Sequence, residues 1–286
     1  MAIVLDNITY TYGMGTPFEK TALHGISLTI ENGEFLGVIG HTGSGKSTFV
    51  QHLNGLLHPT TGTVTVNGVD ISASTEEVKK MRHKVGMVFQ YPEHQLFEET
   101  IAEDIAFGPK NLGLSSDEVD ERVRDAMKFV GLDYNTYAER SPFHLSGGQM
   151  RRVAIAGVVA MNPDFLVLDE PSAGLDPFGR EEIFEEIIRL HKEKGITVIL
   201  VSHNMEDISR MASRLVVLDK GRIVLDGEPM DIFNNHRDAL QAVGVDVPPV
   251  SVTMEYLREQ GLDVSNRVLS VDDAVEAILE GGSHVK

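Results

Sequence analysis

The chain has 286 residues, 42% of them hydrophobic, which is enough to bury a core as one large domain or two smaller ones. Its 43 acidic and 25 basic residues give a formal net charge of −18, which disfavours non-specific binding to nucleic acid or anionic lipid. The absence of cysteine excludes disulfides, thiol catalysis and thiolate metal sites. No signal peptide is recognised, and no apolar run approaches the roughly 20 residues of a spanning helix, so we expect another chain to supply any membrane part.

The first 33 residues alternate in polarity as strands do, in the segments 3–5, 8–12 and 26–30. Tyr12 ends the second segment just before a glycine-containing loop, where its ring could stack on a nucleotide base. An aromatic residue in a strand more commonly serves packing, so Tyr12 alone predicts no site.

Residues 40–48 match the phosphate-loop pattern G-x-x-x-x-G-K-[ST], between an apolar strand segment at 34–39 and a helical segment. Glycines let backbone N–H groups turn around an anion, and the helix start adds its positive dipole end. Lys46 can reach the β- and γ-phosphates of a nucleotide, and the Ser47 hydroxyl can ligate Mg²⁺. The nucleotide-binding residues predicted in this loop are Gly40, His41, Thr42, Gly43, Ser44, Gly45, Lys46, Ser47 and Thr48.

The segment 165–168 is entirely apolar and is followed by two carboxylates, Asp169 and Glu170. Such a segment is typical of a central parallel strand, whose carboxyl end faces the ligand crevice of an open α/β sheet. Beside a phosphate loop, Asp169 is predicted to hold Mg²⁺ and Glu170 to act as a general base for water. The alternative is that both acids cap the next helix.

Two further apolar segments end in polar side chains. Residues 84–89 precede Gln90, and residues 197–201 precede Ser202 and His203. His203 could donate a hydrogen bond to a phosphate oxygen, although a histidine at such a position is more commonly structural when it stands alone.

Helical patterns replace strand patterns from about residue 95 to 160, including a capped helix start at Ser116. The region closes with L-S-G-G-Q at 145–149, whose double glycine at a helix start presents free N–H groups to an anion. Asp176 and Pro177 are predicted as the N-cap and first residue of a further helix.

The composition changes again from about Pro229. Residues 234–236 and 247–249 are typical of linkers, and short helical patterns follow at 254–260 and 272–279. No site chemistry is predicted there, so we expect an appendix that serves packing or dimerisation.

The order of these motifs resembles the ATP-binding-cassette (ABC) ATPases over residues 1 to about 228, and L-S-G-G-Q makes the resemblance specific. It implies an α/β P-loop NTPase fold with a RecA-like parallel sheet, an N-terminal antiparallel β subdomain and a helical insertion subdomain at about 95–160. The cassette would span residues 1–228, and a small C-terminal helical appendix would span 229–286. Two such cassettes would close head to tail on two ATP molecules.

The resemblance also implies roles for single residues. Tyr12 would stack on adenine, residues 43–48 would hold the phosphates, and Asp176 would lie at the dimer seam. Ser146 and Gly148 would contact the γ-phosphate that the opposing subunit binds. The signature residues implied in nucleotide binding are Ser146, Gly147, Gly148 and Gln149. The implied catalytic residues are Lys46, Gln90, Glu170 and His203. The implied magnesium ligands are Ser47, Gln90 and Asp169.

Residues 89–100 and 104–111 carry a narrower resemblance, to the ATPases of energy-coupling-factor (ECF) importers for vitamins and transition-metal ions, and most of all to their EcfA2 or CbiO-like type. It implies a peripheral subunit on the cytoplasmic face of the cell membrane, paired with a second ABC ATPase subunit. A transmembrane T-component would dock near residues 90–100, and a substrate-binding S-component would join through the complex. The acidic residues expected to face basic groups of the T-component are Glu93, Glu98 and Glu99.

Three functions remain to be compared: a transport ATPase, an ATPase of the same superfamily that acts on ribosomes or DNA, and a nucleotide-binding regulator without turnover. The single cassette and the acidic charge favour transport over the second. An intact Glu170 and His203 disfavour the third. The transported solute, and the choice between a homodimer and a heterodimer, stay open.

Overall fold

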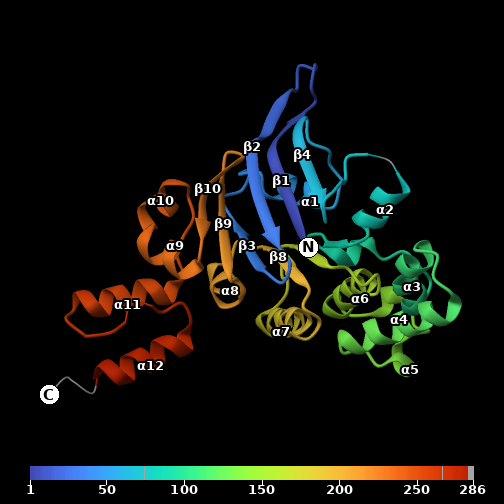
Figure 1. Ribbon diagram of the computed structural model, residues 1–286. Coiled ribbons are helices and arrows are strands. Elements are labelled where there is room, and N and C mark those ends of the chain that lie inside the picture. The colour runs from blue at the N-terminus through green and yellow to red at the C-terminus, as the bar shows by residue number, and fades with distance from the viewer. Residues whose placement is uncertain (74, 266, 283–286) are drawn as a thin grey trace.

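A central six-stranded sheet carries the predicted motif segments (Figure 1). The computed structural model describes residues 1–73, 75–265 and 267–282. The strands follow the order β10-β9-β3-β8-β7-β6. Four of them are buried at every position, as expected for parallel strands covered on both faces. These strands are β3 (Phe35–Ile39), β6 (Val85–Val88), β7 (Phe165–Asp169) and β8 (Thr197–Val201).

One edge of this sheet departs from the parallel arrangement. β9 (Arg214–Asp219) runs parallel to β3, whereas β10 (Arg222–Gly227) pairs antiparallel with β9. Only Lys220 and Gly221 join the two strands, both with positive φ, and a two-residue turn can connect only antiparallel neighbours. The sheet is therefore mixed, with a RecA-like parallel part and one antiparallel edge strand.

A second, antiparallel sheet is built mainly from the N-terminal residues, in the order β2-β1-β4-β5. Its strands are β1 (Ala2–Tyr12), β2 (Lys20–Glu31), β4 (Thr61–Val66) and β5 (Val69–Asp70). The β1–β2 hairpin extends beyond the rest of the molecule at the top of Figure 1. Apolar residues of both sheets and of α1 (Lys46–Leu53) form one core cluster, so this sheet is fixed against the phosphate-loop strand.

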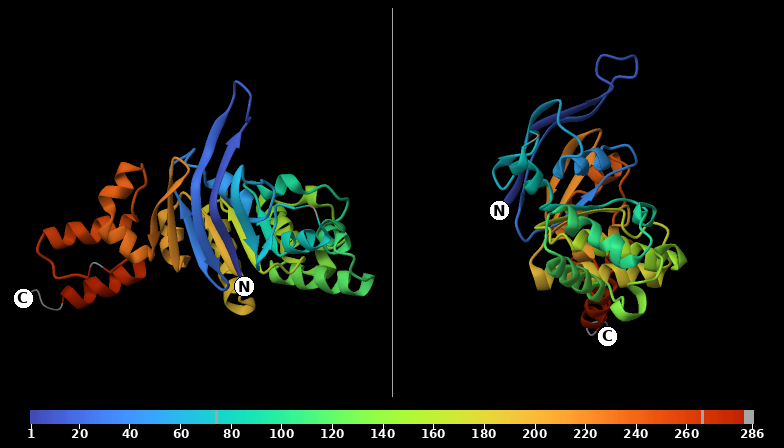
Figure 2. Two further views of the ribbon diagram at one scale, coloured as in Figure 1. Left: turned by 45° about the horizontal axis from the view of Figure 1, so that its top comes forward. Right: turned by 90° about the vertical axis from the view of Figure 1, so that its right-hand side faces the viewer.

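The helical region lies at the β6 end of the six-stranded sheet (Figures 1 and 2). It contains α3 (Ile101–Asn111), α4 (Ser116–Phe129), α5 (Tyr134–Tyr137) and α6 (Gly147–Val159), with 3-10 turns η1 (Pro92–Gln95) and η2 (Pro142–His144). The cap of α4 is Ser115, whose side chain accepts from the N–H of Glu118, so the predicted cap at Ser116 is one residue too late.

Several short helices escaped prediction. α2 (Glu76–Arg82) and α8 (Met205–Met211) are two turns long, and each begins at a side-chain cap, Thr75 and Asn204. α9 (Pro229–Asn235) contains Asn234 and Asn235, so the linker predicted at 234–236 is wrong at those two residues. Two turns are too short to show a reliable helical period.

The C-terminal part begins with helices that belong to the main core. Ile232 and Phe233 of α9, Leu240 of α10 (Arg237–Ala242) and Val245 join the cluster beneath the six-stranded sheet, which also contains residues of α7 (Pro177–Lys194). Beyond them, α11 (Pro249–Glu259) and α12 (Val271–Gly282) form a hairpin with its own small cluster, which includes Met254. This hairpin lies at the end of the molecule opposite the helical region (Figure 2). None of the helices in the described ranges is long and apolar enough to cross a bilayer.

Candidate nucleotide site

A cavity of about 580 Å³ opens where the phosphate loop and the carboxyl ends of β7 and β8 meet the N-terminal sheet. Most of the predicted site residues line it, from five separate parts of the chain. Those residues are Tyr12, Thr42, Gly43, Gly45, Lys46, Ser47, Thr48, Gln90, Asp169, Glu170 and His203. The tyrosine hydroxyl lies 3.1 Å from Thr48 Oγ1, which fixes the ring at the cavity rim, where 41% of the residue is exposed.

Three of the residues predicted in the phosphate loop do not line the cavity. Gly40 supports the loop from below, because a Cβ there would lie 2.2 Å from the carbonyl oxygen of Leu218. The side chain of His41 is turned to Asp219, with Nε2 2.9 Å from Oδ1, and Ser44 is fully buried. These three residues shape the loop, whereas the remaining loop residues face the cavity.

Lys46 is buried, and its Nζ donates to the carbonyl oxygens of Gly40 at 2.6 Å and His41 at 3.0 Å. Burial lowers the pKa of Lys46, while the carboxylates of Glu170 and Asp169 raise it in part. A cationic ammonium inside a glycine loop, at the start of a helix, is an arrangement that binds phosphate oxygens.

The two carboxylates after β7 differ in environment. Burial raises the pKa of Asp169, and a hydrogen bond from Ser47 and the charge of Lys46 oppose that rise. Burial and the neighbouring Asp169 charge raise the pKa of Glu170 to about 7. Glu170 Oε1 is buried without a hydrogen-bond partner and lies 3.4 Å from His203 Nε2. A carboxylate that titrates near neutrality suits a general base.

The alternative that these acids cap the next helix is wrong. α7 begins at Pro177, and its cap is Asp176, whose carboxylate accepts from the N–H of Gly179 at 2.7 Å. The carboxyl groups of Asp169 and Glu170 are therefore free to face the cavity.

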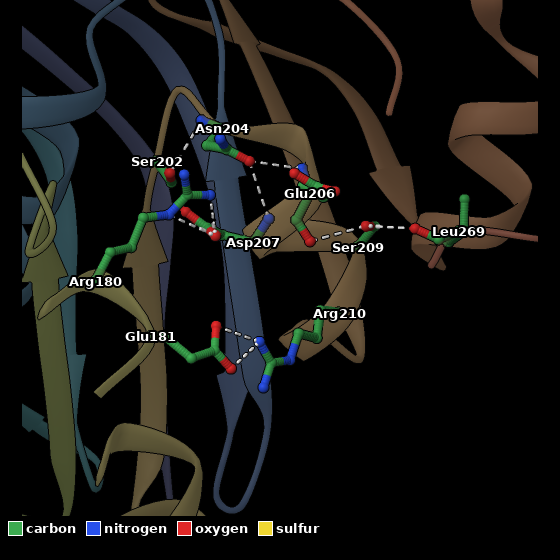
Figure 3. A network of polar contacts seen from close by, with 9 residues as sticks. All are labelled: Arg180, Glu181, Ser202, Asn204, Glu206, Asp207, Ser209, Arg210 and Leu269. Carbon is green, nitrogen blue, oxygen red and sulfur yellow. Dashed lines mark hydrogen bonds and ion pairs between the residues drawn. The ribbon is translucent and has the colours of Figure 1, made fainter. Parts of the chain in front are cut away.

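The segment with His203 is held by a polar network (Figure 3). Asn204 caps α8 by accepting from the N–H groups of Glu206 and Asp207. Asp207 binds Arg180 of α7, and Ser209 Oγ donates to the carbonyl oxygen of Leu269 at 3.1 Å. α8 is thus fixed both to the helix that follows Asp176 and to the C-terminal part of the chain.

The signature residues lie in a different cleft, of about 400 Å³. Ser146, Gly147, Gly148, Gln149 and Asp176 all line it, and none of them lines the first cavity. The Ser146 hydroxyl and the Gln149 side chain form a capping box at the start of α6, and added Cβ atoms at the two glycines would meet nothing within 4 Å. The geometry therefore divides the predicted nucleotide-binding residues into two groups on one chain.

Sequence reasoning missed several residues of the first cavity. Lys20, Thr21, Ala22 and His24 of β2, and Lys220 of the β9–β10 turn, line it. No motif marks them, because they reach the cavity only through the packing of the N-terminal sheet against the phosphate loop.

The first cavity also contains the oxygen donors that a magnesium ion would need. Ser47, Gln90 and Asp169 offer hydroxyl, amide and carboxylate oxygens to the same cavity, which fits the preference of Mg²⁺ for oxygen. No cluster of three or more histidines, cysteines or acids that could hold a metal occurs among the residues described by the structure. The donor set therefore suits a metal that shares its coordination with substrate phosphates, as Mg²⁺ commonly does.

Comparison with known proteins agrees with this geometry. The family model described as "ABC transporter" matches residues 23–173. The energy-coupling factor transporter ATP-binding protein EcfA2 of Clostridium tetani (strain Massachusetts / E88) is 53% identical over 280 residues, 98% of this chain and 97% of that protein. EcfA2 of Clostridium acetobutylicum is 54% identical over 279 residues, again 98% of this chain and 97% of the relative.

Solved structures give the same result. The structure of cbiO1 from Clostridium perfringens, described as part of the ABC transporter complex cbiONQ, has a TM-score of 0.74 at 36% identity and covers 88% of this chain and 98% of its own. The dimeric cassette MJ0796, in a post-hydrolysis state with ADP and Pi, has a TM-score of 0.70 at 32% identity and covers 79% and 98%.

The fold, the phosphate loop and the signature helix define an ABC ATPase, which binds and hydrolyses ATP for transport. The chain belongs to this family and, within it, to the EcfA2 type of ECF transporter ATP-binding proteins. The expectation of a transport ATPase is confirmed over the two alternatives.

Proposed function

We propose that this chain hydrolyses MgATP in its first cavity as one of two paired cassettes, and thereby drives an importer for vitamins or transition-metal ions. The observation that carries the catalytic part is Glu170, a half-buried carboxylate with a pKa of about 7 directly after β7, beside the phosphate loop. A base with this pKa is partly ionised at neutral pH and can still accept a proton from attacking water.

The roles of the remaining residues follow from their positions. Lys46 and the loop N–H groups bind the β- and γ-phosphates, and Tyr12 at the rim stacks on adenine. Ser47, Gln90 and Asp169 hold Mg²⁺, which offsets the negative charge that develops on the phosphoryl oxygens. His203 lines the same cavity and donates to the γ-phosphate through a ring N–H; burial and the nearby Lys46 charge lower its pKa, and the neutral ring keeps one donor nitrogen for this bond.

The cleft with Ser146 serves the nucleotide of the paired cassette. Its open glycines and the first turn of α6 present N–H groups outward, and Asp176 lines the same cleft at the start of α7. A head-to-tail pairing, with either a second copy or a sister ATPase, supplies each phosphate loop with a signature cleft.

The membrane partner docks on the segment after Gln90. In this arrangement the chain is a peripheral subunit at the cytoplasmic face of the membrane. Phe97 and Phe107 meet edge to face there, 56% and 46% exposed. Glu98 and Glu99 lie beside them, and no side-chain hydrogen bond or ion pair of either occurs within the described ranges. Glu93 does not belong to this surface, because its carboxylate binds Arg151 within the chain.

Glu170→Gln tests the catalytic assignment. We expect hydrolysis to fall by about 10²- to 10⁴-fold, since the amide cannot accept the proton, while the affinity for ATP stays close to that of the wild type. Steady-state turnover and equilibrium nucleotide binding measure the two effects. Turnover near the wild-type rate would remove Glu170 from the role of base.

Glu98→Lys tests the docking surface. We expect basal ATP hydrolysis to be unchanged and co-purification of a polytopic membrane subunit from native membranes to fall several-fold, because the new charge would repel basic groups of the partner. Glu121→Lys on the exposed face of α4 is the matched charge reversal. Equal recovery of the membrane subunit with both variants would place the docking surface elsewhere.

A further inference from the structure

Arg151 is a buried cation in a chain whose other arginines lie mostly at the surface. It occupies the second turn of α6, just beyond the signature residues, and only 1% of it is exposed. Its guanidinium donates to Glu93 through Nε at 3.1 Å and Nη2 at 3.0 Å, and to the carbonyl oxygen of Pro171 through Nη1 at 2.9 Å. Burial favours a neutral Glu93, but the hydrogen bonds from Arg151 hold the pKa of that carboxyl below its usual range.

These contacts join three segments that are far apart in the sequence. Glu93 lies in η1, three residues after Gln90 and four residues before Phe97 of the proposed docking surface. Pro171 directly follows Glu170. Arg151 itself belongs to the helix that starts at the signature residues. A guanidinium is planar and rigid. A displacement of Glu93 is therefore transmitted to Pro171 more directly than it would be through the flexible side chain of a lysine.

The segment that receives these bonds is strained. Glu170 has a φ of 51°, a left-handed conformation that is unfavourable for a residue with a side chain, and it precedes a proline, which restricts its backbone further. Such a conformation persists only where the surroundings hold it. On one side the N–H of Glu170 donates to Val201 at 3.0 Å, and on the other the Pro171 carbonyl accepts from Arg151.

We propose that Arg151 is a positioning residue that, through the carbonyl oxygen of Pro171, holds the Glu170–Pro171 segment in its strained conformation and connects it to η1, so that a partner docked after Gln90 adjusts the position of Glu170. The connection to the docked partner rests on the docking surface proposed above. The hold on Glu170 does not depend on it.

The first experiment measures the ATPase cassettes alone. Arg151→Gln is expected to lower kcat about 10- to 100-fold, because a small displacement of a reacting group has that effect, while KM for ATP stays within about twofold. Arg151→Lys should restore part of kcat, since an ammonium can donate to one partner but not to both in the original geometry. Arg124→Gln, which removes an exposed Arg–Asp pair on α4, should leave both constants unchanged.

A double variant guards against simple misfolding. Arg151→Met together with Glu93→Met removes both buried charges, so no unpaired charge remains and the fold is expected to persist. Turnover is counted per chain that binds nucleotide. A reduced kcat in this variant supports the hold on Glu170, and a wild-type kcat per nucleotide-binding chain in it, or in Arg151→Gln, would overturn that hold.

The second experiment uses the complex purified from membranes. Glu93→Gln keeps the bond from Arg151 to Pro171, so we expect basal kcat within about threefold of the wild type. The membrane subunit should still co-purify with this variant. Its presence should, however, no longer change kcat as it does in the wild type. An undiminished response would overturn the connection to η1. If the wild-type chain recovers no membrane subunit, the docking proposal fails together with that connection, whereas the kcat of Arg151→Gln still decides the hold on Glu170.

Discussion

Side chains with a shifted pKa occur outside the nucleotide site as well, and Glu186 of α7 is the clearest example. Burial raises its pKa to about 7, the charges of Arg152 and Arg189 oppose the rise, and Glu182 adds to it. Glu186 Oε2 is buried without a hydrogen-bond partner. The ionised carboxylate therefore destabilises the folded state.

The stability of the fold therefore depends on pH through Glu186. The pKa of Glu186 is about 7 in the folded chain against an ordinary 4.5, so folding takes up a proton between these values and stability falls as pH rises through that window. Glu186→Gln should therefore stabilise the protein at pH 8 by on the order of 2 kcal/mol and have little effect at pH 4.5. Denaturant unfolding at both pH values measures this. Glu185→Gln, at the exposed neighbouring residue, is the control. An equal gain in stability of Glu186→Gln at both pH values would contradict the prediction.

Residue identity in a motif was enough to predict which side chains gather at the cavity. The motif residues Lys46, Asp169 and His203 converge there, since each lies at or after the carboxyl end of a strand of one sheet and the carboxyl ends of parallel strands meet at one edge. His41 shows the limit, because its side chain turns to Asp219, a partner 178 residues away in the sequence. A local pattern does not contain such a contact, and the partners of Arg151 escaped prediction for the same reason.

At the scale of elements, α8 is held to α7 by two ion pairs that differ in burial (Figure 3). Asp207 is 8% exposed in its ion pair with Arg180, whereas Arg210 and Glu181 are each nearly half exposed. Burial raises the pKa of Asp207, and the hydrogen bond from Arg180 opposes this. Removing one partner of a buried ion pair destabilises the folded protein, because the other charge is left unpaired, whereas an exposed ion pair contributes little to stability.

Asp207→Asn should therefore destabilise the protein by about 1–3 kcal/mol, because Arg180 loses its charged partner in a largely buried position. Arg210→Gln, on the exposed pair of the same helix, should change stability by less than about 0.5 kcal/mol. Thermal unfolding of the two variants under identical conditions provides the measurement. Similar losses for both would show that burial does not distinguish these pairs.

Elements with a long, clear pattern were predictable, and short ones were not. The apolar segments became β3, β7 and β8, and the helix from Pro177 to Lys194 begins at the expected Asp176 cap. α2 and α8 owe their existence to single capping side chains and to packing, neither of which leaves a periodic signal.

For the whole molecule, the position of the domain boundary has consequences for stability. The predicted boundary at residue 229 precedes Phe233 and Leu240, which are fully buried in the core beneath the six-stranded sheet. The hairpin of α11 and α12 has a separate small cluster. We therefore propose a division near residue 248, although Leu269 of the later part also joins the main core cluster.

Two truncations test this division. A chain that ends at Gly227 should lose more than about 5 kcal/mol or fail to fold, because removing even one buried phenylalanine costs about 3–5 kcal/mol. A chain that ends at Val247 keeps α9 and α10 and should lose less than about half as much. Denaturant unfolding compares the two, and equal stability would restore the boundary at 229.

The separation of the two clefts on one chain also determines which nucleotide site of a pair a mutation impairs. Under the proposed pairing, a chain with a damaged Ser146 keeps a sound phosphate loop of its own and spoils the hydrolysis of the nucleotide on its neighbour. Such a lesion acts in trans, while a lesion at Glu170 acts in cis. Two inactive chains, one of each kind, would complement each other and restore one working site in every mixed pair.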